Sequence, residues 1–89
     1  MKVEYLPTFI KDLKSLKSSP AYAKIKVFCF EEVLVYQNLS EVNNIKKLKS
    51  EDNAYRVRVG EYRVGFTLAD NTITFTRVLH RREFYSHFP

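Results

Sequence analysis

Apolar residues in the first part of the chain recur every three or four positions, which is the period of an amphipathic helix. A short alternating segment, Met1–Tyr5, precedes them and is predicted to be a strand that ends before Pro7. The first helix is predicted over Phe9–Lys17 with Thr8 as its N-cap, because its apolar residues share one face and its charged residues the other. This pattern is typical of a helix that lies on a core.

A second helix is predicted to begin at Pro20, because Ser19 is a favourable N-cap and proline is favoured at the first helical position. The helix extends to about Gln37, and its inward stripe consists of Tyr22, Ile25, Cys29, Val33 and Tyr36. The next segment, Asn38–Asn53, is polar and rich in lysine. We expect it to be a basic connector that is helical in part.

From Ala54 onward apolar and polar residues alternate, which is the period of a half-buried strand. Turn residues at Gly60–Glu61 and Asp70–Asn71 divide this region into a three-stranded antiparallel meander. The predicted strands are Ala54–Val59, Tyr62–Ala69 and Thr72–Leu79. A short tail then ends at Pro89. The expected fold class is α+β, in a single domain over residues 1–89. Its elements are an N-terminal strand, a two-helix hairpin, the meander and the tail. The helices are expected to pack on one sheet face.

Three arginines are predicted to share the sheet face that the helices leave open. If Gly60–Glu61 is a two-residue turn, Arg58 lies directly opposite Arg63, and Arg56 lies two residues away on the same face. Like charges paired across a ladder are destabilising, so folding alone gives no reason for this arrangement, whereas a bound anion does. A solvated face that resists aggregation is the alternative interpretation.

The third meander strand adds basic and aromatic residues to the same neighbourhood. Its alternation slips near Arg77–Val78, which predicts a bulge. The strand leads into His80, Arg81 and Arg82, and then Phe84 and Tyr85. Guanidinium groups bind phosphate oxygens and aromatic rings stack on bases, so the combination favours single-stranded RNA over duplex DNA.

Charge and composition narrow the class of protein. The formal net charge of +5 favours a polyanion or an acidic protein as the partner. The single Cys29 excludes an internal disulfide, and no metal-ligand spacing or cofactor motif is present. No segment approaches the length of a membrane span, and no signal core is found in Met1–Ile10. We therefore expect a cytoplasmic protein without a metal or other cofactor.

Two segments resemble the signature of the RelE/ParE toxin superfamily. They are Tyr55–Val64, with the sequence YRVRVGEYRV, and Leu79–Tyr85, with the sequence LHRREFY. The predicted order of elements also agrees with that family. For its RelE-like branch the resemblance implies cleavage of ribosome-bound mRNA without a metal. In that reaction a ribose 2′-hydroxyl attacks the adjacent phosphate and leaves a 2′,3′-cyclic phosphate.

The resemblance also implies roles for individual residues. Arg56 and Arg58 match two basic positions that hold the RNA backbone. Arg63 matches the basic position after the aromatic residue, here Tyr62, and Arg81 matches one that stabilises the pentavalent phosphate. Tyr85 matches a tyrosine that stacks on a base and assists proton transfer.

One departure from the family leaves the general base unassigned. Some RelE-like enzymes carry lysine where Arg56 and Arg58 stand, and arginine cannot serve as a base. His80 is the first candidate because of its titration range, and Tyr85 is the second. Glu51 or Glu61 qualifies only if folding brings either close. A structural or exposed role for His80 is an equal alternative.

The remaining basic and aromatic residues have less specific interpretations. Arg82 is a further candidate for RNA binding. Lys46, Lys47 and Lys49 are expected to form a general electrostatic surface for RNA. Phe84 and Phe88 are expected to pack the tail against the first helix.

Three functions remain open at the level of sequence. The first is a ribosome-dependent endoribonuclease, which acts on mRNA and is controlled by a cognate antitoxin. The second is a ParE-like toxin that poisons DNA gyrase without nuclease activity, and the third is an inactive nucleic-acid-binding member. An acidic, partly disordered antitoxin segment would neutralise the basic face, and the toxin-antitoxin complex is a candidate for binding operator DNA. No membrane partner is expected.

Overall fold

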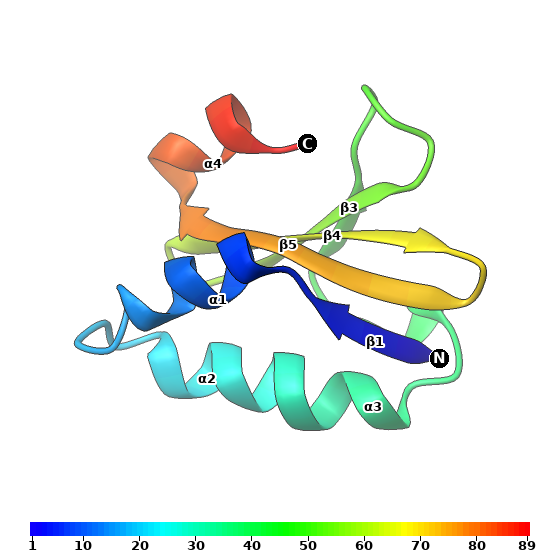
Figure 1. Cartoon of the computed structure of the whole chain (residues 1–89), viewed down its shortest axis with the longest axis horizontal. Coiled ribbons are helices and arrows are strands. Elements are labelled where there is room, and N and C mark those ends of the chain that lie inside the picture. Colours follow the sequence, from blue (N-terminus) through cyan, green and yellow to red (C-terminus); the bar gives the residue numbers. More distant parts are fainter.

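A five-stranded mixed sheet forms the centre of the computed structural model, which describes all of residues 1–89 (Figure 1). The strands lie in the order β1 (Lys2–Tyr5), β5 (Thr72–His80), β4 (Tyr62–Ala69), β3 (Ala54–Val59) and β2 (Ile45–Lys47). The first strand runs parallel to β5, and all other neighbours are antiparallel. The α+β class and the three-stranded meander are therefore confirmed.

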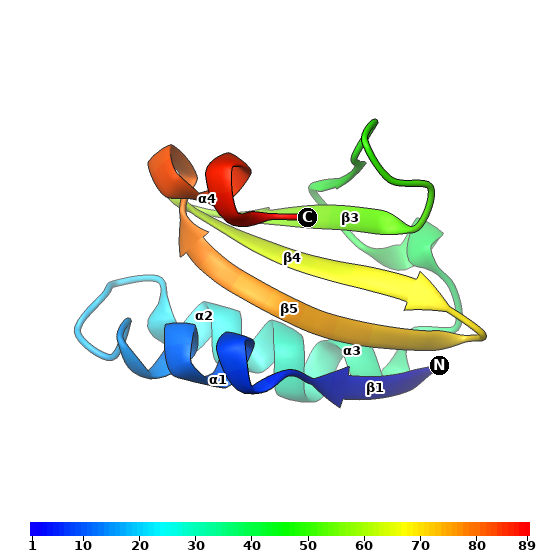
Figure 2. The ribbon, with the colours of Figure 1, turned by 45° about the horizontal axis from the view of Figure 1, so that its top comes forward.

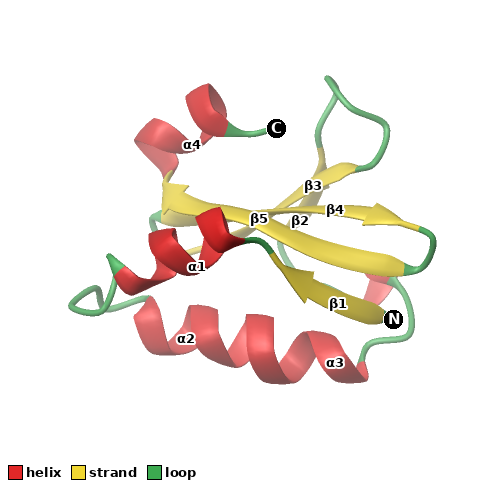
Figure 3. Cartoon of the chain, viewed as in Figure 1, coloured by secondary structure: helices red, strands yellow, loops and turns green.

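The helices lie on both sides of this sheet (Figures 2 and 3). One side is covered by α1 (Pro7–Lys14) and by a continuous helical segment made of α2 (Tyr22–Val27), a π-helical turn (Phe28–Glu32) and α3 (Val33–Val35). The other side carries α4 (Arg81–His87), where the sequence predicted only a tail. The expectation that helices pack on one face thus holds for α1 to α3, and α4 is an addition.

The main core lies between the sheet and helices α1 to α3. Fourteen buried residues form it, and its centre is a group of phenyl rings in which Phe9, Phe66 and Phe75 are 0–1% exposed. The Phe9 and Phe75 ring centroids are 5.3 Å apart, and Phe66 meets Phe75 edge to face at 5.8 Å. Aromatic pairs at these distances add stabilisation beyond the burial of their area.

The meander follows its prediction closely, because alternation and turn chemistry specify it locally. The bounds of β3 and β4 are those predicted, and β5 extends one residue further than expected, to His80. Phe66 pairs with Phe75 but Gly65 pairs with Arg77, so Thr76 is the extra residue of a bulge. This bulge lies next to the predicted slip in alternation.

The helix ends differ more from their predictions. The first helix begins at Pro7 rather than Phe9, and Leu6 occupies the N-cap position. The predicted cap, Thr8, instead donates a hydrogen bond from Oγ1 to the Thr76 carbonyl oxygen at 2.9 Å, where the bulge leaves that oxygen accessible. The first helix ends at Lys14 and not Lys17. The second helical segment runs from Tyr22 to Val35, inside the predicted range of 20–37.

The basic connector contains a strand that the sequence did not predict. A 3₁₀ turn occupies Leu39–Glu41, and β2 then pairs Ile45–Lys47 with Tyr55–Val57 of β3. Three residues are too few for alternation to be visible, and two of the three are lysines. The strand forms because the edge of β3 supplies its hydrogen-bond partners, which is a tertiary effect.

The carboxylate of Asp12 joins α1 to the bulged part of β5. Oδ2 accepts hydrogen bonds from Arg77 Nε at 2.7 Å and from the Val78 amide at 3.1 Å, and Oδ1 accepts one from Arg77 Nη2 at 3.1 Å. The bond to Asp12 is the main reason that the pKa of Arg77 is raised above its ordinary value.

We expect Asp12→Ala to lower the free energy of unfolding by about 2–3 kcal/mol, because hydrogen bonds to charged groups contribute about this much and the Val78 amide loses its partner. Urea denaturation measures the change. Asp52→Ala removes an exposed carboxylate that makes no ion pair and serves as the control. Equal stability of the Asp12→Ala and Asp52→Ala proteins would contradict this account of the α1–β5 junction.

The thiol of Cys29 is completely enclosed in the main core, as its position in an apolar stretch indicated. Burial raises the pKa of this thiol far above its usual range, so the reactive thiolate is absent at neutral pH. We expect a thiol-specific reagent to leave the native protein unmodified and to label one thiol per chain in denaturant. Rapid labelling of the native protein at pH 8 would show that this part of the core opens readily.

Candidate nucleic-acid interface

The β3–β4 hairpin places basic residues in register on the sheet face opposite the main core. Arg58 pairs directly with Arg63, as a two-residue Gly60–Glu61 turn requires, and Gly60 adopts the positive φ of +58° that this turn needs. Arg56 pairs with Lys46 of β2 on its other side. We call the four residues Lys46, Arg56, Arg58 and Arg63 the basic face.

The three arginines of the basic face have no carboxylate partner. Arg63 Nη1 donates to the carbonyl oxygens of Gly60 at 3.1 Å and Tyr62 at 3.0 Å. Arg56 and Arg58 donate only to oxygens of Asn44. The two ion pairs of the molecule are Arg77–Asp12 and Arg81–Glu61, and neither includes these arginines. The face therefore presents adjacent positive charges that the protein itself does not neutralise.

Arg81 begins α4 and lies beside the β3–β4 turn. Its Nε is 3.0 Å from Glu61 Oε2, and its backbone amide donates to the Glu61 carbonyl oxygen at 2.8 Å. Both side chains are more than half exposed, so the pair is solvated and contributes little to stability. A phosphate can therefore replace the carboxylate at low cost.

His80 acts as the N-cap of α4. Its Nδ1 accepts a hydrogen bond from the Arg82 amide at 3.2 Å, and its ring meets the Tyr62 ring edge to face at 5.6 Å. The bond assigns an unprotonated Nδ1, so the neutral ring carries its proton on Nε2. The lone pair that a general base needs is then already engaged. This geometry favours the structural interpretation of His80.

A groove between α4 and the segment around β2 brings Tyr85 together with the lysines. It has a volume of about 410 Å³ and is lined by Lys46, Lys47, Leu48, Lys49, Ser50, Tyr85, Phe88 and Pro89. The Tyr85 side chain is 56% exposed and its ring rests edge to face against Phe84 at 5.0 Å. The three lysines therefore line the same groove as an accessible aromatic ring, which the sequence did not indicate.

The tail aromatics pack on a different surface from the one predicted. Phe84 and Phe88 are buried in a second cluster with Leu48 and Ala54, on the sheet face opposite α1. The residue that admits them is Gly65: a Cβ atom there would lie 2.9 Å from Phe84 Cε1 and from two Phe88 ring atoms. The prediction that they pack against the first helix is therefore wrong. Small residues among the arginines of β3 and β4 were the signal that was missed.

The other predicted site residues are more scattered. Arg82 is exposed on α4, where its side chain makes no hydrogen bond or ion pair. Glu61 is occupied by its ion pair with Arg81, and Glu51 lies exposed in the loop before β3. No group of three His, Cys, Asp or Glu side chains is placed to hold a metal ion, and no helix is long and apolar enough to cross a membrane.

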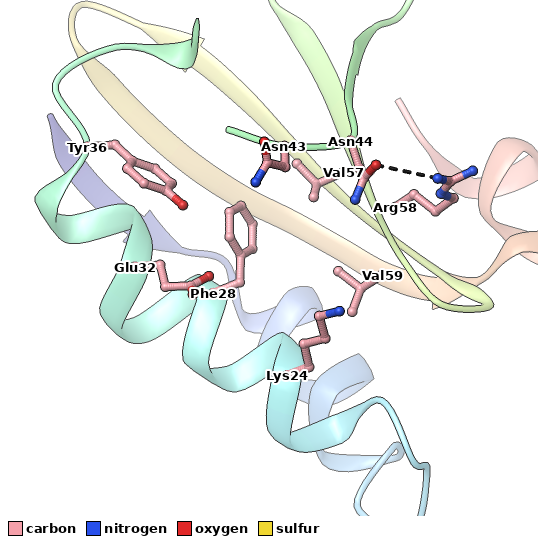
Figure 4. A pocket seen from close by; sticks show the side chains of 9 residues that line it. All are labelled: Lys24, Phe28, Glu32, Tyr36, Asn43, Asn44, Val57, Arg58 and Val59. Carbon is pink, nitrogen blue, oxygen red and sulfur yellow. Dashed lines mark hydrogen bonds between the residues drawn. The ribbon is translucent and has the colours of Figure 1, made fainter. Parts of the chain in front are cut away.

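A second cavity lies between the helical segment α2–α3 and the edge of β3 (Figure 4). It has a volume of about 220 Å³ and is lined on the helical side by Lys24, Phe28, Glu32 and Tyr36 and on the other by Asn43, Asn44, Val57, Arg58 and Val59. Asn44, which lines this cavity beside Arg58, was not a candidate from the sequence. Its positive φ of +62°, immediately before β2, is visible only in the folded chain.

Comparison with known proteins identifies the family. Residues 3–85 match the model described as ParE toxin of type II toxin-antitoxin system, parDE. The chain is 41% identical to Toxin RelE3 of Methanocaldococcus jannaschii over 91 residues, which cover 100% of both proteins. It therefore belongs to the RelE/ParE superfamily of toxins from type II toxin-antitoxin systems.

Solved structures agree with this assignment. A chain of the RelB-RelE antitoxin-toxin complex from Methanococcus jannaschii is 38% identical with a TM-score of 0.76, covering 97% of this chain and 99% of that one. A chain of the E. coli DinJ-YafQ complex shares the fold at 21% identity, with a TM-score of 0.75 and coverage of 94% and 97%.

Proposed function

We propose that this toxin is a ribosome-dependent, metal-independent endoribonuclease that cleaves mRNA and thereby inhibits translation. The observation that carries the proposal is the basic face, whose three arginines lack any acidic partner within the protein. The nearby groove adds an accessible tyrosine and three lysines that line the same groove. Permanent cations and a stacking ring are the two features that binding of single-stranded RNA requires.

The arrangement suggests a division of labour during the reaction. Arg56 and Arg58 hold phosphates of the RNA backbone, and a base stacks on the ring of Tyr85. As the 2′-hydroxyl attacks, negative charge grows on the phosphate oxygens, and Arg63 and Arg81 stabilise it. The Nδ1 atom of His80 is engaged as a cap. The Tyr85 hydroxyl, like the three lysines of the groove, has no hydrogen-bond partner in the protein and is free to take part in proton transfer.

We infer that a cognate antitoxin neutralises the basic face. The Methanococcus jannaschii relative was solved as a complex of antitoxin and toxin. A chain with a net charge of +5 and unpaired arginines on one face is complementary to an acidic segment that folds on binding. The complex of the two proteins is in turn a candidate for binding operator DNA.

Primer extension on an mRNA translated in a purified system tests the nuclease function. We compare the wild type with Arg81→Ala and Tyr85→Ala, and with Lys17→Ala as a control that removes an exposed charge after α1. Discrete cuts within ribosomal A-site codons are expected for the wild type and the control, and not for the other two proteins. Intact mRNA with every protein would refute the proposal.

The match to a ParE model supports a second candidate function, in which the toxin poisons DNA gyrase without cutting RNA. A supercoiling assay with purified gyrase separates the two candidates. Inhibition of gyrase together with intact mRNA would establish the second function. An inactive nucleic-acid-binding protein would affect neither assay.

A further inference from the structure

Asn44 contacts both arginines that the proposed function assigns to the RNA backbone. Its carbonyl oxygen accepts hydrogen bonds from Arg56 Nη1 at 2.9 Å and from the Arg58 backbone amide at 3.2 Å. Its side-chain Oδ1 accepts a bond from Arg58 Nη2 at 3.4 Å, which Figure 4 shows as a dashed line. One residue thus holds two guanidinium groups that come from alternate positions of β3.

We propose that Asn44 is a positioning residue that fixes the direction and spacing of the Arg56 and Arg58 guanidinium groups for binding phosphates of single-stranded RNA. The inference rests on the proposed function, because it concerns how the same face engages its substrate.

The electrostatics of the basic face explain why such a residue is needed. Arg58 lies directly opposite Arg63, and Arg56 lies opposite Lys46, so each of the two arginines has a like charge across the ladder. Without a restraint, these long side chains would turn away from one another. RNA binding would then be weakened by the conformational entropy lost when the side chains are ordered again. A neutral oxygen can hold a guanidinium group without cancelling its charge.

The hydrogen bonds leave the outer part of the Arg56 side chain available. Its Nε atom is buried without a partner, and its Nη1 atom donates to the Asn44 carbonyl oxygen. The third nitrogen, Nη2, makes no hydrogen bond within the protein. The enclosed end of the guanidinium group is therefore fixed, and Nη2 remains to donate a charge-assisted hydrogen bond to a phosphate oxygen.

Asparagine meets both requirements of this position. Its backbone adopts φ of +62°, which asparagine and glycine tolerate better than other residues. Its amide oxygen then supplies the acceptor for Arg58. The Asn44→Gly variant keeps the backbone conformation and the carbonyl bonds, and removes only the Oδ1 acceptor. The adjacent Asn43 makes no hydrogen bond through its side chain, so Asn43→Gly is the matched control.

Two measurements test the inference. The first is binding of the toxin to programmed ribosomes whose mRNA carries 2′-O-methyl groups in the A-site codon, so that no cleavage occurs. We expect Asn44→Gly to weaken binding by about fivefold to tenfold, as the loss of one exposed hydrogen bond of 3.4 Å implies, and Asn43→Gly to leave it unchanged. In an Arg58→Ala background, Asn44→Gly should have no further effect, because its acceptor serves Arg58.

The second measurement needs no RNA. Nitrogen relaxation of the arginine Nε–Hε groups should show greater mobility of Arg58 in Asn44→Gly than in the wild type or Asn43→Gly. Unchanged mobility, or an equal loss of binding by Asn44→Gly with and without Arg58, would overturn the positioning role even if the RNA-binding function holds. Binding that Arg58→Ala does not weaken would instead overturn the assignment of this face to RNA, and the inference with it.

Discussion

Replacement of Arg81 by alanine is expected to slow mRNA cleavage on the ribosome by about 100-fold or more, with a much smaller loss of binding. The reason is that, in the proposed reaction, the guanidinium group faces a charge that grows only as the phosphate becomes pentavalent. In the free protein the backbone of Arg81 is fixed beside the β3–β4 turn by the hydrogen bond from its amide to the Glu61 carbonyl oxygen, so the start of α4 does not depend on RNA. Single-turnover cleavage and binding to ribosomes with uncleavable mRNA measure the two effects separately.

Two further variants sharpen this experiment. Arg82→Ala removes the adjacent charge, which has no partner in the protein, and should reduce only binding and its salt dependence. Arg56→Ala should weaken binding with a smaller effect on the chemical step. If Arg81→Ala and Arg56→Ala lose binding and cleavage in equal proportion, the division of labour between these arginines is refuted.

Replacement of Phe84 by alanine is expected to detach α4 from the sheet while the main core stays folded. The Phe84 ring is completely buried, and truncation of such a ring costs about 3–5 kcal/mol. The packing of α4 depends on a cluster of only four buried residues, whereas fourteen others form the core on the opposite face. The loss should therefore appear as local opening of α4 rather than global unfolding.

Trypsin reports this opening directly, because Arg81 and Arg82 lie in the first turn of α4. We expect rapid cleavage there in Phe84→Ala under conditions in which the wild type and Phe84→Leu are stable. Gly65→Ala should act in the same direction, since its new methyl group would lie too close to the rings of Phe84 and Phe88. A fall in global stability without faster cleavage at α4 would show that the two clusters unfold as one unit.

The local features of the sheet could be predicted from sequence, because period and turn chemistry decide them. The Arg58–Arg63 pair followed from a turn of two residues, and the bulge from a slip in alternation. The surroundings of Tyr85 could not be predicted from the sequence. They depend on β2, a strand of three residues, and on the direction in which α4 returns over the sheet. The small residues that admit α4, Gly65 and Ala54, indicate that something packs closely there, but they do not indicate which segment does.

The roles of single polar residues were the least predictable. His80 was a candidate base on its titration range, yet its Nδ1 atom caps α4. Asn44 was part of a polar connector, and only its folded conformation shows that it holds two arginines of another strand. Such roles depend on hydrogen-bond partners that are distant in sequence, and composition or period carries no information about them.

The parallel pairing of β1 with β5 has a consequence for how a cell produces this toxin. The first strand joins the sheet beside Thr72–Phe75, about 70 residues later in the chain, so the sheet is completed only when nearly all of it is available. In a growing chain β1 is therefore made long before β5, the strand with which it pairs, and α4, which carries Tyr85, follows β5. The groove that contains Tyr85 should consequently form only after the meander has folded.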